Sequence, residues 1–139
     1  TGLAEQRSDC SDMIDALFNQ PNYQATKKLL DVSTMRHEAL ASNLANLETP
    51  NYKRLDVSPA FEAELRQAVA TQDPSLIGSL RARLEVDSTA QSSGRDGNTV
   101  QLETELMKLN QNTLEHTLET QLISASLLKL RQAITGRAA

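Results

Sequence analysis

Two histidines are the residues with the most direct potential for chemistry. His37 is followed by Glu38, as at the start of a zinc-protease helix, but the second histidine of that motif is absent. Neither His37 nor His116 is followed by the Lys-Gly pair that usually accompanies a phosphotransfer histidine. We therefore expect ordinary hydrogen-bonded or half-exposed histidines. A soluble helical regulatory or phosphotransfer module remains a second hypothesis.

Other short motifs are incomplete. Asp96-Gly97-Asn98 begins like a calcium-binding loop but lacks the later ligands, and the segment 94–97 is too short for a phosphate-binding loop. The single cysteine, Cys10, excludes an internal disulfide and a zinc site built on cysteines. The spacing suggests no Ser-His-Asp or paired-carboxylate arrangement. The sequence therefore predicts no enzyme, no cofactor and no metal site.

Amide and hydroxyl side chains interrupt an apolar helical stripe within the stretch 41–54. Ser42, Asn43 and Asn46 come close together, and Pro50 then ends the helix because its ring removes an N–H donor. Asparagine is common near helix ends, which is the simpler interpretation. We favour a second one, in which buried amides fix the register of a helical interface by demanding a partner.

Helical periodicity identifies the elements that hold this stretch. Apolar residues recur at steps of three and four from Pro21 to about Leu47, which predicts a long helix with one buried face. A short amphipathic turn at 13–18 precedes it. Ser58-Pro59 and Asp73-Pro74 each resemble an N-cap followed by proline, and predict two short helices. The alternation over 83–87 indicates an extended stretch.

The last predicted element is the longest helix. It follows a flexible loop over 88–97, and Asn98 with Gln101 resembles a capping box at its start. Two stripes run along it: Leu102, Leu106, Leu109, Thr113, His116, Thr120, Ile123, Leu127, Leu130 and Ile134 form the first, and Met107, Leu114, Leu118, Leu122 and Ala125 the second. We therefore expect partners on two faces of this helix. An antiparallel pairing with the first helix would place Pro21 near Ser126.

Composition sets broad limits. Aromatic residues make up only 3% of the chain, which favours an elongated helical body over a globule. The net charge is −4 with both signs interspersed, which argues against a nucleic-acid or anionic-membrane partner. No apolar run approaches the roughly 20 residues that span a bilayer, and no pattern marks a cleavable signal peptide.

We expect a mainly α-helical fold in which long N- and C-terminal helices form an antiparallel coiled-coil hairpin, with a small irregular middle region of short helices and an extended stretch. The chain divides into a flexible extension or non-native remnant at 1–12, an N-terminal helical segment at 13–54, a variable middle region at 55–97 and a long C-terminal helix at 98–139. A two-helix hairpin with a spare apolar face is a poor candidate for independent stability, so that face should seek neighbours.

The N-terminal signature shared by bacterial flagellar rod and hook proteins is similar to residues 41–53, which read Ala41-Ser42-Asn43-Leu44-Ala45-Asn46-x-x-Thr49-Pro50-x-Tyr52-Lys53. The closing region from Asp96 to Glu105 and the opening from Met13 to Asn19 resemble those of a proximal rod member. Asn51 stands where this family usually has glycine, and asparagine also tolerates a positive φ.

The resemblance implies a structural subunit of the flagellar basal-body rod. Such a subunit assembles through coiled-coil packing of its terminal helices into the proximal rod, which transmits torque and encloses the export channel. Implied partners are copies of itself, other rod subunits, the adaptor and ring protein at the rod base, and the flagellar export apparatus. The implied location is the periplasmic basal body, reached without a cleaved signal peptide and without membrane insertion. Another proximal rod protein of the same family is the alternative within this class.

For the assembly interface we predict side chains from the signature and from the last helix. They are Leu40, Asn43, Leu44, Asn46, Leu47, Thr49, Pro50, Tyr52, Leu114, Leu118, Leu122, Ile123, Leu127 and Leu130. In this interpretation the asparagines set the register between neighbouring subunits, and the segment 49–52 fixes the angle at which the chain leaves the helix.

Overall fold

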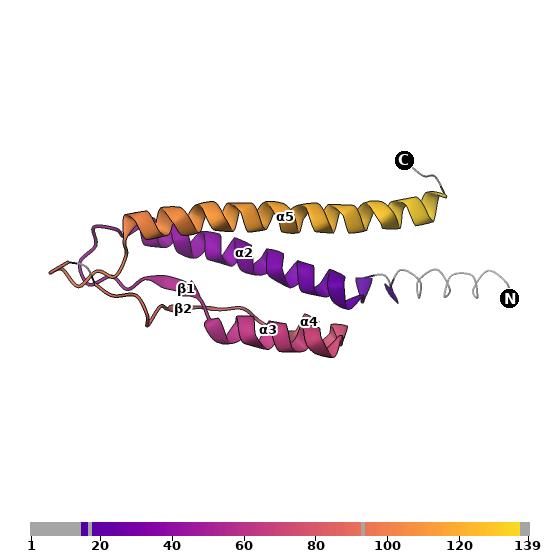
Figure 1. The fold of residues 1–139 in the computed structure, drawn as a ribbon, viewed down its shortest axis with the longest axis horizontal. Coiled ribbons are helices and arrows are strands. Elements are labelled where there is room, and N and C mark those ends of the chain that lie inside the picture. The colour runs from indigo at the N-terminus through magenta and orange to yellow at the C-terminus, as the bar shows by residue number, and fades with distance from the viewer. Residues whose placement is uncertain (1–14, 17, 93, 137–139) are drawn as a thin grey trace.

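Two long helices dominate the computed structural model, which describes residues 15–16, 18–92 and 94–136. They run side by side in opposite directions, and the elements between them in sequence lie on the far side of the first helix (Figure 1). The elements are α2 (Pro21–Ala45), β1 (Leu55–Val57), α3 (Pro59–Thr71), α4 (Pro74–Ser79), β2 (Leu84–Val86) and α5 (Leu102–Thr135). The predicted mainly helical fold with long first and last helices is confirmed. Of the predicted turn at 13–18, residues 15, 16 and 18 are helical, and the other three fall outside the described residues.

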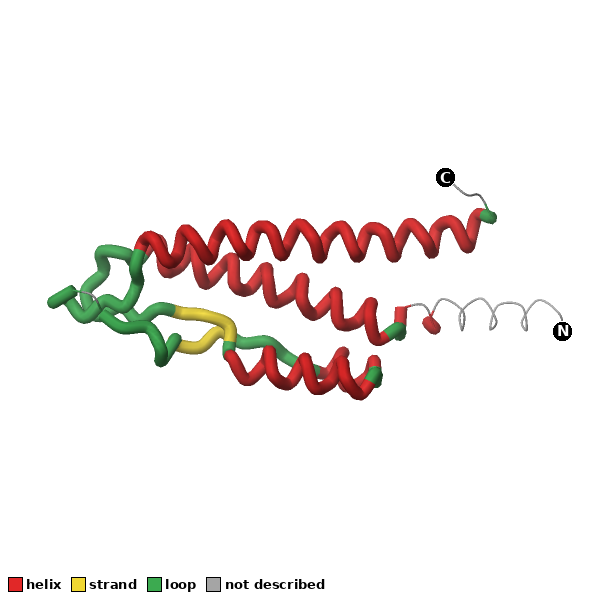
Figure 2. Tube along the Cα trace, in the orientation of Figure 1, coloured by secondary structure: helices red, strands yellow, loops and turns green. Residues whose placement is uncertain are grey.

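A two-stranded antiparallel sheet joins the middle region to the end of α2 (Figure 2). Leu55 pairs with Val86, and Val57 with Leu84. The extended stretch predicted at 83–87 therefore forms β2. β1 was not predicted, because three residues are too few to show a period of two.

The two short helices begin where the sequence predicts. Asp73 caps α4, since its Oδ1 accepts a hydrogen bond of 2.9 Å from the N–H of Ser75. Ser58 and Pro59 occupy the same positions at the start of α3, although the Ser58 side chain makes no capping bond.

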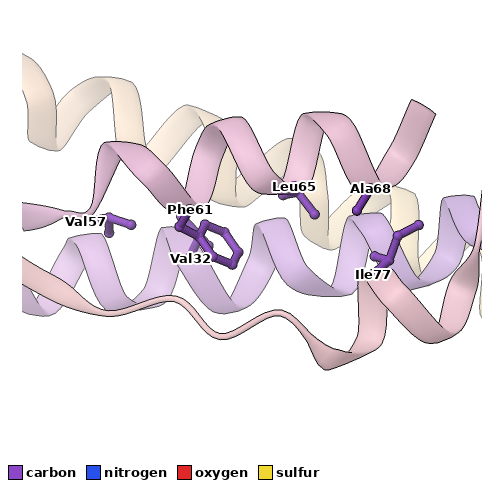
Figure 3. Close-up of a cluster of buried hydrophobic side chains, with 6 residues drawn as sticks. All are labelled: Val32, Val57, Phe61, Leu65, Ala68 and Ile77. Atoms are coloured by element: carbon purple, nitrogen blue, oxygen red, sulfur yellow. The ribbon is translucent and has the colours of Figure 1, made fainter. Parts of the chain in front are cut away.

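The hydrophobic core lies between α2 and the middle region (Figure 3). It consists of Val32, Val57, Phe61, Leu65, Ala68 and Ile77. Burial of such a side chain contributes about 1.5–3 kcal/mol. The predicted buried face of α2 is therefore covered by the middle region, chiefly by α3 and α4.

The seam between α2 and α5 is largely polar. Ser33 Oγ lies 3.0 Å from Nδ1 of His116, and Nδ2 of Asn112 donates to the Ser33 carbonyl over 2.9 Å. One groove is lined by both Asn22 and Ser126, which agrees with the predicted pairing of Pro21 with Ser126. Hydrogen-bonding side chains therefore contribute to the alignment of the hairpin.

Candidate assembly interface

The end of α2 is closed by side chains of the signature. Asn46 is the C-cap residue, and its Nδ2 donates to the carbonyl of Ser42 over 2.9 Å. Thr49 Oγ1 donates in turn to Asn46 Oδ1 over 3.2 Å. Asn51 adopts a φ of 60°, the positive value that asparagine tolerates. The simpler interpretation, helix termination, accounts for Asn46.

Asn98, from the segment that precedes α5, caps the same end of α2. Its Nδ2 donates to the carbonyls of Asn46, Leu47 and Thr49, each over 2.9 Å. Carbonyls at a helix C-terminus have no partner within the helix, and Asn98 supplies one. The capping box predicted at Asn98 is therefore wrong: α5 begins at Leu102, and Asn98 caps the end of α2 instead.

Asn43 is fully buried inside the chain. Its Nδ2 donates to the Leu55 carbonyl over 2.8 Å and to Glu105 Oε2 over 3.0 Å, while its Oδ1 accepts from the Leu55 N–H over 2.9 Å. The hydroxyl of Tyr52 lies 3.4 Å from the same Oδ1. An amide has two N–H donors, and both are used here within one chain.

This burial corrects part of the predicted interface. Asn43 and Leu40 are hidden within the chain and cannot meet a neighbour in this structure. Within the chain, Asn43 fixes the register between α2, β1 and α5. The partners that a buried amide requires come here from β1 and α5 of the same chain, and a register between subunits stays a prediction.

Arg54 belongs to this site but was not among the predicted residues. Its guanidinium is buried and contacts three carboxylates: Glu105 at 2.5 Å, Asp87 at 2.6 Å and Asp56 at 2.8 Å. Burial alone would lower the pKa of Arg54, but the hydrogen bonds to Glu105 and Asp56 raise it above its ordinary value. The carboxylates are brought to Arg54 by β1, by the residue after β2 and by α5, so no local pattern could have indicated them.

Asp56 connects this cluster to the seam. Besides Arg54, it contacts Arg36 of α2 at 3.5 Å and Lys108 of α5 at 3.2 Å. Burial raises the pKa of Asp56, but the hydrogen bond from Arg54 and further donors hold it below its ordinary value. The pKa of Asp87 is lowered in the same way, by hydrogen bonds from Thr89 and by the charge of Arg54 against the effect of burial. The cluster thus ties both long helices to the sheet.

The outward face of α5 carries the second part of the site. Leu114, Leu118 and Leu122 are 62%, 52% and 58% exposed. At 3.6 residues per turn, Leu118 lies roughly 140° around the helix from Glu105, which faces α2. We call Met107, Leu114, Leu118, Leu122, Ala125 and Lys129 the outward stripe. Leu122 and Lys129 also border the groove that contains Asn22 and Ser126, but the leucines of the stripe stay more than half exposed in the described part of the chain.

The other predicted interface residues differ in exposure. Leu44, Asn46, Leu47, Tyr52, Ile123 and Leu130 are half-buried, whereas Thr49, Pro50 and Leu127 are exposed. The hydroxyl of Tyr52 lies 3.0 Å from Ser42 Oγ, near the end of α2. The structure thus gathers the signature residues at one end of the hairpin and leaves the leucines of α5 along its length.

Contiguous exposed apolar side chains are typical of a protein–protein contact. Across the described residues, no group of three His, Cys, Asp or Glu side chains is placed to hold a metal ion. In that same part of the chain, no helix combines the length and apolar character needed to cross a membrane. The arrangement suits binding to other protein surfaces.

Comparison with known proteins finds relatives of this chain. No family model matches the chain. The flagellar basal body rod protein FlgB of Aquifex aeolicus is 32% identical over 114 residues, which cover 81% of this chain and 91% of that protein. FlgB of Borrelia hermsii is 31% identical over 67% of this chain and 80% of its own length. FlgB of Aeromonas hydrophila is 28% identical, with coverages of 77% and 87%.

Proposed function

The chain belongs to the FlgB family of flagellar basal body rod proteins, and from this premise we propose how its surfaces build the rod. The protein is a structural subunit of the flagellar basal body rod. We propose that its terminal helices pack against those of neighbouring subunits as coiled coils. The observation that carries this proposal is the row of exposed leucines on α5.

The free energy of burying apolar side chains favours assembly through that face. Each leucine that becomes buried in a contact contributes about 1.5–3 kcal/mol, before the costs of association are subtracted. The same leucines contribute little to the isolated chain because they remain half exposed or more. Subunit contacts therefore complete the burial that the single chain leaves unfinished.

The proposed partners are other rod subunits and further copies of this chain. We extend the proposal to the adaptor and ring protein at the rod base and to the export apparatus. The rod would lie in the periplasm, reached without a cleaved signal peptide, and would enclose the export channel and transmit torque. The regulatory or phosphotransfer alternative has less support, because each relative named above is a rod protein.

A substitution on the outward stripe tests this function. In cells that depend on this gene, we expect Leu118→Lys to abolish rods and motility, while the purified variant keeps its helical circular dichroism and urea midpoint. Thr117→Lys adds the same charge about 100° away around α5 and serves as the control. Normal motility in the Leu118→Lys strain would contradict the proposed role of this face.

A further inference from the structure

An apolar groove of about 500 Å³ runs between α2, α3 and α5. Its apolar lining comes from Ala25, Leu29, Val32, Phe61, Leu65 and Val69. Leu29 is 43% exposed, so the groove is an open surface and not a sealed part of the core. A row of apolar side chains from another helix would fit along it.

One of the charged side chains at the groove, Glu119, has no cationic partner among the described residues. Arg36 contacts Glu62 at 2.5 Å and Glu115 at 3.4 Å, but Glu119 forms no ion pair among the described residues. Oε2 of Glu119 is buried and lacks a hydrogen-bond partner within the described part of the chain. A buried carboxylate oxygen without a donor destabilises the folded chain, because it has lost its hydrogen bonds to water and has formed none within the protein. A cation brought in by a partner would remove that cost.

The outward stripe carries such a cation. Leu118, Leu122, Ala125 and Lys129 follow one another at steps of four, three and four along one face of α5. Lys129 is exposed and forms no ion pair among the described residues. From residue 121 to 136 the helix contains no acidic residue. This end of the stripe is therefore both apolar and basic.

The stripe and the groove also agree in length. Glu119 lies across from about Leu29 in the hairpin, as the pairs Asn43–Glu105 and Asn22–Ser126 indicate. Leu29 and Arg36, at the end of the groove, are seven positions apart, and so are Leu122 and Lys129. At 1.5 Å per residue, each span is roughly 10 Å, so two turns of a neighbouring helix would fit between Glu119 and this end of the groove.

We propose that the outward stripe of one copy docks in the groove of a second copy, with Leu122 and Ala125 against its apolar lining and Lys129 donating to Glu119. This proposal rests on the rod function above and names the partner of the outward stripe. The two surfaces are different, so the contact is head to tail. Repetition of such a contact produces an open helical array, whereas a two-fold contact closes on itself.

A charge exchange tests the pairing in the purified chain. By sedimentation equilibrium we expect Lys129→Glu and Glu119→Lys each to weaken self-association about tenfold, and the double exchange to recover most of it. Arg131→Glu makes the same charge change on another face of α5 and should have little effect. Equal weakening by Arg131→Glu, no recovery in the double exchange, or a wild-type chain that stays monomeric at millimolar concentration would each overturn the proposal.

Disulfide trapping gives a measurement that does not depend on those charges. Arg66 lines the groove, so Arg66→Cys should cross-link to Leu122→Cys when the two variants are mixed, each in a Cys10→Ser background. Gln67→Cys, exposed on α3 outside the groove, is the matched control. Equal yields from Arg66→Cys and Gln67→Cys would count against docking in the groove.

Gene deletion separates this proposal from the rod function. If deletion leaves flagella intact, the rod function fails. If deletion removes flagella while Lys129→Glu and Glu119→Lys strains swim as well as the Arg131→Glu strain, only the groove contact fails.

Discussion

Asn43 of α2 and Glu105 of α5 meet in a site that solvent does not reach, joined by a hydrogen bond of 3.0 Å from Nδ2 to Oε2. They are 62 positions apart in sequence. Because both side chains are fully buried, a shift of α5 along α2 would leave an amide and a carboxylate without partners. The pair therefore fixes the alignment of the hairpin from within.

Asn43→Leu should destabilise the single chain. The leucine cannot bond to the Leu55 backbone or to Glu105, so buried polar groups lose their partners. We expect the free energy of unfolding, measured by urea denaturation, to fall by about 2–4 kcal/mol. Asn46→Leu, at the half-buried helix end, should cost about 1 kcal/mol. Equal losses for the two variants would contradict the central role of Asn43.

Arg54→Met should be more damaging than an ordinary loss of an ion pair. It leaves the buried carboxylate of Glu105 without its cation, which costs about 3–5 kcal/mol. Arg83→Met is the control, because Arg83 is 74% exposed and its pair with Glu85 contributes at most about 1 kcal/mol. Both values come from urea unfolding curves. A combined Arg54→Met and Glu105→Met variant should recover part of the loss; no recovery would show that the damage comes from lost packing.

Stability should fall as the solution becomes acidic. The pKa values of Asp56 and Asp87 in the folded chain lie below the ordinary value of 3.8. Their contribution is therefore fully present above the unfolded value and is lost as pH drops through the folded values. Urea unfolding between about pH 6 and pH 3 should show this slope, and Asp56→Asn and Asp87→Asn should each flatten it. An unchanged slope in both variants would exclude the cluster as its source.

Gly97→Ala should strain the loop before α5, where Gly97 lies against Asn51. Gly97 has a φ of 72°, and an added Cβ would lie 2.6 Å from Asn51 Oδ1. Gly136→Ala is the matched control, because its φ is 63° but no atom lies within 4 Å of the added Cβ. Thermal unfolding should show a loss of about 1–3 kcal/mol at Gly97 and a smaller one at Gly136. Similar losses would mean that only the backbone angle matters.

Local signals in the sequence predicted the helices well. The period of α2, the proline starts of α3 and α4, and the alternation in β2 all depend on residues close to one another. The sequence also indicated two apolar faces on α5, and the exposed outward stripe agrees with that. Asn51 showed the positive φ that its residue type tolerates.

Long-range partners could not be read from the same signals. Asn98 has the spacing of a capping box, yet it binds carbonyls about 50 positions earlier. Arg54 collects carboxylates from three separate elements, and Asn43 finds its partner on α5. The partners of these groups come close only when the helices and the sheet have packed together. Local patterns therefore show which residues need partners and leave the partners open.

The position of the core on only one side of α2 has a consequence for how the chain opens. Amide hydrogens of α2 and α3 are shielded by packed aliphatic side chains, whereas α5 beyond Glu119 leaves most of its side chains in water. Segments with few buried contacts open at a lower free energy than the whole molecule. Deuterium should therefore enter the far end of α5 first and the amides around Val32 last. Subunits that bind along α5 would slow exchange at that end most.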